Sequence, residues 1–133
     1  MTRRPFAATL LVALALTASA HAADAPVTAT LDEDGVQRAS IVLDSYSYAP
    51  GHLIVMAGKP VELMLTKEGF APHDFVIDDA AAGFTVKQDV GGDGVKVSFT
   101  PMKPGTYAIY CSKKAPFAAS HREKGMEGVL EVR

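Results

Sequence analysis

Residues 105–133 read GTYAIYCSKKAPFAASHREKGMEGVLEVR, two strand-like runs joined by a long connection. The runs, at 106–111 and 128–133, contain the β-branched and aromatic side chains that strands prefer. Cys111 ends the first run, His121 lies within the connection, and Met126 comes just before the second run. A connection between two neighbouring strands could therefore bring a thiol, an imidazole and a thioether together.

The residues before this stretch show the same pattern of short strands and turns. Apolar or alternating runs cover residues 39–48, 52–56, 60–67, 73–78, 84–90 and 95–100. The turns between them are rich in glycine and proline, which bend the chain. Val61, Leu63 and Leu65 alternate with side chains of the opposite face, which predicts one buried and one wet face. These features favour an all-β fold, either a β-sandwich or a small barrel.

One short helix is expected, and it falls inside the long connection. Pro116 can take the first position of a helix, and Phe117, Ala118 and Ala119 follow it. The sequence therefore predicts a helix within residues 116–123.

The first residues have the layout of a secretory signal peptide. Arg3 and Arg4 precede an uncharged apolar run at 6–18, which is followed by small residues up to Ala22. A membrane-spanning helix would need about 20 apolar residues, so the run is too short to cross. We expect a signal peptide at 1–22, a flexible N-terminal tail at 23–37 and a single domain at 38–133. The protein should be periplasmic and have no membrane span.

The charge and the cysteine content of the chain limit the classes of function that it can have. The chain has 13 basic and 15 acidic residues, and its net charge changes from −2 to −4 if residues 1–22 are removed, because two basic residues lie there. A mildly acidic protein is a poor partner for nucleic acid. Cys111 is the one cysteine of the sequence. In an oxidising compartment it would be a buried thiol, an intermolecular bridge, a nucleophile or a metal ligand.

The neighbours of Cys111 favour the metal ligand. Electron-transfer copper sites combine one thiolate and two imidazoles with a weak axial thioether. His121 and Met126 lie in the same connection as Cys111, and His73 begins a separate strand. Glu123 or Glu127 could replace Met126 as an oxygen ligand.

These residues resemble the cupredoxin family, and its plastocyanin-like members in particular. The resemblance rests on GTYAIYCS at 105–112, on His121 and on MEGVLEV at 126–132, together with IVMAG at 54–58 and PHDFVI at 72–77. It implies a Greek-key β-sandwich that binds one copper ion, as Cu(I) or Cu(II), through His73, Cys111, His121 and Met126. It also implies the transfer of single electrons between larger proteins.

Two features depart from the family pattern. Nine residues separate Cys111 from His121, where family members have a much shorter connection. Asp74 follows the first histidine in place of an asparagine that often braces the cysteine loop. An aspartate at this position could accept backbone N–H bonds but could not donate.

The expected function is therefore a monomeric, one-electron copper carrier with a redox protein as partner. A copper-handling or metal-uptake accessory protein would use the same ligands and remains open. An enzyme is not expected, since a multicopper oxidase needs more histidines than His52, His73 and His121 provide, and a Cys111–His121 nucleophile pair has no oxyanion hole in the sequence.

Basic residues flank the site and could form a solvated rim or a docking face for an acidic partner: Lys113, Lys114, Arg122 and Lys124. We assign His52 to the surface, and we expect three methionines to be packing residues, although a surface cluster of them could hold Cu(I): Met56, Met64 and Met102.

Overall fold

The computed structural model describes residues 25–133. The expected signal peptide at 1–22 lies outside the described residues. Within residues 25–133, no helix has the length and apolar character needed to cross a membrane.

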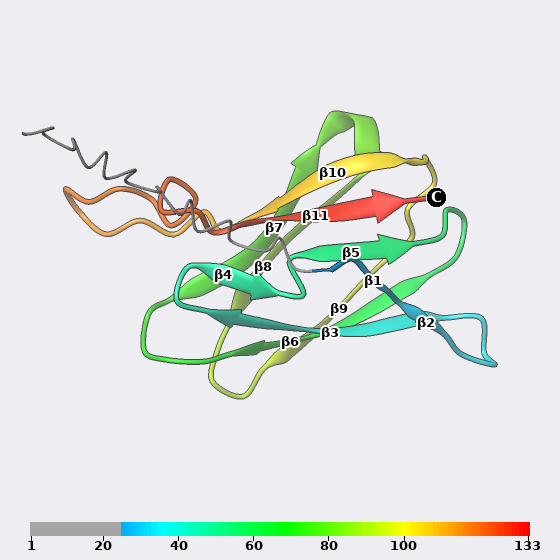
Figure 1. Ribbon diagram of the computed structural model, residues 1–133, viewed down its shortest axis with the longest axis horizontal. Helices are drawn as coiled ribbons and strands as arrows, with labels where there is room; N and C mark the ends of the chain where they lie inside the picture. Colours follow the sequence, from blue (N-terminus) through cyan, green and yellow to red (C-terminus); the bar gives the residue numbers. More distant parts are fainter. Residues whose placement is uncertain (1–24) are drawn as a thin grey trace, which may run out of the picture.

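Two β-sheets pack face to face in the described part of the chain (Figure 1). One sheet has the strand order β1-β5-β11-β10-β7-β8, with bounds Val27–Thr28, His52–Val55, Glu127–Val132, Gly105–Tyr110, His73–Asp79 and Phe84–Val90. The other has the order β2-β3-β6-β9, with bounds Thr30–Leu31, Gln37–Asp44, Val61–Lys67 and Val95–Phe99, and β4, Ser47–Ala49, pairs with β3. The chain passes from sheet to sheet at β1–β2, β4–β5, β5–β6, β6–β7, β8–β9 and β9–β10. The all-β sandwich predicted from the sequence is confirmed.

The core lies between the sheets and follows the predicted alternation. Val61, Leu63 and Leu65 of β6 are buried, whereas Met64 between them is exposed. The opposing sheet contributes buried side chains from its central strands: Leu53, Phe75, Ile77, Tyr107, Ile109 and Leu130. Burying a large apolar side chain stabilises a fold by about 1.5–3 kcal/mol, so this layer holds the strands of both sheets in place.

Residues 27–28 and 30–31, which we expected to lie in a flexible tail at 23–37, form strands β1 and β2. β1 pairs in parallel with β5, and β2 pairs antiparallel with β3. Ala29 between them is buried, and Gln37 is buried at the start of β3. The segment is polar and too short to show a strand period, but pairing with existing edges satisfies its backbone.

The run predicted as one strand at 39–48 is two strands. β3 and β4 form a hairpin whose turn residues, Ser45 and Tyr46, have φ values of 35° and 66°. Hairpin turns of this kind usually contain Asn-Gly or Asp-Gly, so the sequence Ser-Tyr gave no turn signal.

The helix predicted within 116–123 is not formed. Instead, the Ala118 N–H donates to the Ala115 carbonyl at 3.2 Å, closing a turn with Pro116 and Phe117 at its centre. Phe117 has a φ of 60°, a left-handed value that cannot continue a right-handed helix. The short 3₁₀ helix of the described chain is Ala80–Ala82, between β7 and β8, where the Asp79 side chain caps the Ala81 N–H.

Three segments meet at one end of the sandwich. In Figure 1 the orange connection between β10 and β11 extends from this end, next to the β3–β4 hairpin and the β6–β7 loop. β7 begins here and β10 ends here, so this end holds the predicted ligands.

Candidate metal centre

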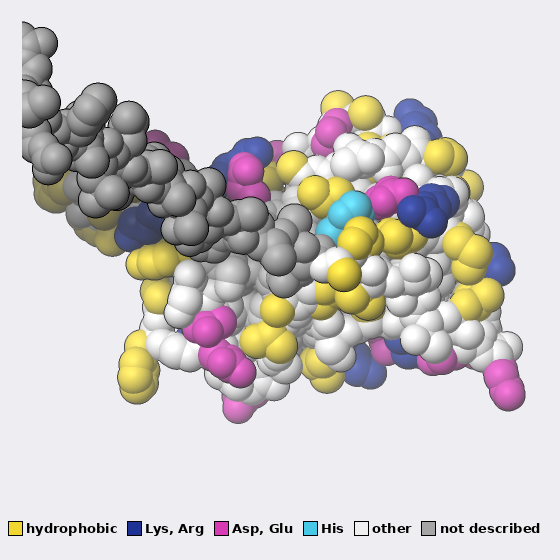
Figure 2. Space-filling view, in the orientation of Figure 1, with side chains coloured by type: hydrophobic (Ala, Val, Ile, Leu, Met, Phe, Trp, Pro, Cys, Tyr) yellow, Lys and Arg dark blue, Asp and Glu magenta, His cyan; other side chains and the backbone are white. Residues whose placement is uncertain are grey.

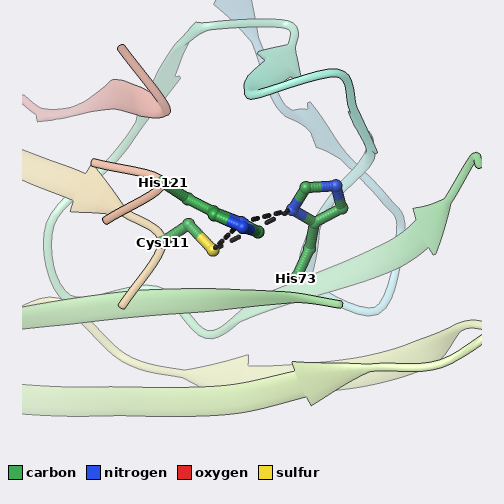
Figure 3. Close-up of side chains that lie close together, drawn as sticks. All are labelled: His73, Cys111 and His121. Carbon is green, nitrogen blue, oxygen red and sulfur yellow. Dashed lines mark hydrogen bonds between the residues drawn. The ribbon is translucent and has the colours of Figure 1, made fainter. Parts of the chain in front are cut away.

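His73, Cys111 and His121 point toward one another at this end of the sandwich (Figure 3). His73 is the first residue of β7, Cys111 directly follows β10, and His121 begins a turn in the connection to β11. All three are buried, with exposed fractions of 2%, 0% and 6%. The structure therefore brings together three of the four predicted ligands, which are far apart in sequence.

Their three inner atoms form a compact triangle. Cys111 Sγ lies 3.5 Å from His121 Nδ1 and 4.0 Å from His73 Nδ1, and the two nitrogens are 3.2 Å apart. The point equidistant from these atoms is about 2 Å from each, close to the bond lengths of about 2.0 Å for nitrogen and 2.3 Å for sulfur in zinc sites. The donor set is the one that blue-copper sites use. These residues therefore fit a single copper ion without rearrangement of the backbone.

The protonation of the ligands suits metal binding. Burial lowers the pKa of His73, and the nearby His121 lowers it further. Burial also lowers the pKa of His121, with a contribution from Lys124. Both imidazoles are therefore neutral near pH 7, the form that binds metals. Burial raises the pKa of the Cys111 thiol, so a bound metal must displace its proton.

Met126 is fully buried, and its backbone is hydrogen-bonded to the backbones of His121 and Cys111. Its N–H donates to the His121 carbonyl at 2.9 Å, and its carbonyl accepts from the Cys111 N–H at 3.2 Å. The alternative oxygen ligands are engaged elsewhere on the surface, because Glu123 accepts from Ser120 and Glu127 pairs with Arg122. Met126 is therefore buried beside the centre, and its role as a ligand stays a prediction.

Asp74 braces the cysteine loop. Its buried carboxylate accepts from the Ser112 N–H at 2.6 Å and from the Ser112 hydroxyl at 2.5 Å. Its own N–H points at Cys111 Sγ, 3.5 Å away, and its carbonyl accepts from the Tyr48 hydroxyl at 2.7 Å. The prediction that an aspartate here would accept a backbone N–H is confirmed. The roles of Ser112 and Tyr48 had no signal in the sequence.

Tyr46 of the β3–β4 turn also reaches the site. Its ring packs edge-on against both imidazoles, with centroids 4.9 Å from His121 and 6.3 Å from His73. No pattern in the sequence connects this residue with the ligands.

The basic residues around the centre are mostly engaged with neighbours. Lys113 pairs with Asp89 at 2.5 Å. Arg122 pairs with Glu127 and stacks over Tyr110, and Lys124 lies over the Tyr46 ring. Phe70 and Phe117 are fully exposed on loops at the same end, where Figure 2 shows hydrophobic side chains at the surface.

Residues assigned to other roles lie outside the centre. His52 is on β5 and bonds to Glu131 at 2.9 Å. Met56, Met64 and Met102, which we expected to be packing residues, are exposed instead, with exposed fractions of 37%, 38% and 67%. Met56 directly follows β5, Met64 faces outward on β6, and Met102 lies in the connection between β9 and β10.

Comparisons with known proteins agree with this geometry. The family model described as "Cupredoxin-like domain" matches residues 6–123. No curated protein matches the chain at a significant level.

Three solved structures illustrate the similarity. The first is the metal-binding domain of the Cu(I)-exporting P-type ATPase CopA from Streptococcus pneumoniae D39, determined with Cu(I). It is 22% identical with a TM-score of 0.61, covering 83% of this chain and 97% of the domain. A mutant fern plastocyanin is 25% identical with a TM-score of 0.53, covering 71% and 100%. Auracyanin A, a "blue" copper protein from Chloroflexus aurantiacus, is 19% identical with a TM-score of 0.57, covering 74% and 100%.

Proposed function

The chain belongs to the cupredoxin family and its cofactor is a copper ion, and on this basis we propose that it is a periplasmic carrier of single electrons between redox proteins. The observation that carries the proposal is the buried triangle of His73 Nδ1, Cys111 Sγ and His121 Nδ1. When bound, copper supplies one electron at a time by alternating between Cu(I) and Cu(II).

The protein residues hold this centre in one arrangement. His73 is fixed at the start of a central strand, and Cys111 is fixed by Asp74 and by its backbone bond to Met126. Because the packed strands and these hydrogen bonds fix the donor atoms, little movement is needed when the charge of the centre changes. Low rearrangement favours fast electron exchange.

The surroundings support a protein partner. Phe70 and Phe117 are fully exposed, and they belong to the β6–β7 and β10–β11 connections at the end where the centre lies. The connection contains several basic residues, although the chain as a whole has a net charge of −2. An acidic partner would be attracted to this end, and the association should weaken as salt is added. Export by the predicted signal peptide would place the protein in the periplasm.

A second function is favoured by one comparison. The CopA domain is part of a copper exporter, and a periplasmic protein of the same fold could instead bind copper for delivery or tolerance. Exposed methionines such as Met102 could assist Cu(I) binding. The two functions differ in whether copper stays bound.

Titration with Cu(II) tests the proposed site. We expect one equivalent to produce an intense visible absorption band from the Cys111 thiolate. Cys111→Ser should abolish the band, whereas the control His52→Gln, which changes a histidine outside the centre, should keep it. A band that survives Cys111→Ser would contradict the site.

Redox cycling separates the two functions. An electron carrier should retain its copper through repeated reduction and reoxidation in the presence of a Cu(I) chelator. Transfer of the metal to the chelator on the first reduction would favour copper handling instead.

A further inference from the structure

The Tyr46 ring contacts both histidine ligands at once. It meets His121 with centroids 4.9 Å apart and an interplanar angle of 80°, and His73 at 6.3 Å and 89°. Edge-to-face contacts between rings at these distances are favourable. Because the two imidazoles come from different elements, one side chain restrains the relative position of two ligands.

The backbone of Tyr46 is held in an unfavourable conformation. Tyr46 and its neighbour Ser45 both have positive φ, at 66° and 35°. Such values are uncommon for residues with a β-carbon and are outliers for bulky ones. Strained backbone of this kind concentrates at functional sites. A glycine would form this turn more easily, but it would remove the ring from the imidazoles.

Lys124 connects Tyr46 to the ligand loop. The Lys124 ammonium lies 4.6 Å from the centre of the Tyr46 ring and donates to the Tyr46 hydroxyl at 3.3 Å. Lys124 belongs to the turn between His121 and Met126, whose backbone bonds include Lys124 N–H to the His121 carbonyl at 3.2 Å. The tyrosine therefore joins the β3–β4 hairpin to the segment that positions two predicted ligands.

A cavity lies on the hairpin side of the centre. It has a volume of about 190 Å³, and Tyr46 and His73 share its wall with Asp44, Glu68 and Phe70. A water molecule occupies about 30 Å³ in the liquid, so the cavity could admit a small anion or several waters. Tyr46 lies in this wall, and its ring packs against the imidazoles of His73 and His121.

We propose that Tyr46 is a positioning residue that clamps the two imidazoles and closes the metal centre to outside ligands. The proposal rests on the proposed copper site. The left-handed turn places the ring, and Lys124 holds it in position. Without the ring, the imidazole of His121 loses its edge contact and small ligands can reach the centre from the cavity.

The test compares copper-loaded wild type with Tyr46→Gly. We expect Tyr46→Gly to release Cu(II) to EDTA at least tenfold faster, a change of about 1.4 kcal/mol in the barrier. We also expect azide to alter the visible spectrum of this variant and to leave that of wild type unchanged. Metal-free Tyr46→Gly should keep a cooperative unfolding transition, because glycine relieves the strain of the turn.

Two control variants separate the ring from the turn. Ser45→Gly relieves strain in the same turn but keeps the ring, and it should retain copper as wild type does. Tyr46→Phe keeps the ring and loses only the hydroxyl, so it should remain closed to azide and release copper within about threefold of wild type. If Tyr46→Gly does not fold, Tyr46→Leu, which keeps an apolar side chain but no ring, is measured in the same way.

The outcomes distinguish this proposal from the proposed function. If wild type gives no intense band with Cu(II), the copper site itself is wrong. If wild type gives the band, and the folded variants without the ring release copper at the wild-type rate and ignore azide, the role of Tyr46 is overturned while the site stands.

Discussion

Asp74→Ala should lower the unfolding free energy of the metal-free protein by about 2–4 kcal/mol. The wild-type carboxylate accepts from the Ser112 N–H at 2.6 Å and from its hydroxyl at 2.5 Å, and it is fully buried. Hydrogen bonds to charged groups contribute about 1.5–3 kcal/mol each, and the partly buried Ser112 hydroxyl can recover part of its bond from water. A typical domain is stable by only about 5–15 kcal/mol, so the loss should be easy to detect.

Two further variants calibrate the measurement. Asp78→Ala removes an exposed aspartate from the same strand and should change stability by less than about 0.5 kcal/mol. Asp74→Asn keeps an oxygen for the Ser112 N–H and offers an N–H to its hydroxyl, so it should cost about 1 kcal/mol. Urea unfolding followed by circular dichroism gives each value from the midpoint, provided that the slope is unchanged. Equal midpoints for Asp74→Ala and Asp78→Ala would refute the bracing role.

Two other expectations concern the metal-free protein. Gln37→Ala removes the hydrogen bonds of this buried side chain to the Met56 N–H, the Met56 carbonyl and the Lys59 carbonyl. Urea unfolding should show that the unfolding free energy falls by about 2–4 kcal/mol, and a fall of less than about 0.5 kcal/mol would count against this expectation. Burial lowers the pKa of His73 and His121 in the folded protein below 6.5. The unfolded chain therefore takes up protons at a higher pH than the folded protein does. The stability that the two neutral histidines contribute is complete above pH 6.5 and is lost as the pH falls through their folded-state pKa values. The urea midpoint should fall on acidification from about pH 7 to 5 and fall less in the double variant His73→Gln/His121→Gln; identical slopes for the two proteins would disprove this linkage.

The fold could be predicted from the sequence where buried and exposed side chains alternate with a regular period. In β6, Val61, Leu63 and Leu65 all face the core as predicted. The β3–β4 turn was missed because Ser45 and Tyr46 take positive φ without the glycine or asparagine that usually signals it. The connection was misread as helical for a related reason, because the conformation of Phe117 is set by the folded loop.

The candidate site could be predicted from the sequence only in part. Residue type and order were enough to single out His73, Cys111 and His121, because few chemistries use that combination. The residues that hold them were not, apart from Asp74. Tyr46 reaches the imidazoles through a hairpin turn and a tertiary contact, which neither composition nor periodicity encodes.

X-ray absorption spectroscopy at the copper edge of the loaded wild-type protein tests the central claim most directly. The structure predicts two nitrogen neighbours and one sulfur neighbour at about 2.0–2.3 Å from the ion. A first shell of nitrogen and oxygen alone, without the sulfur of Cys111, would contradict it.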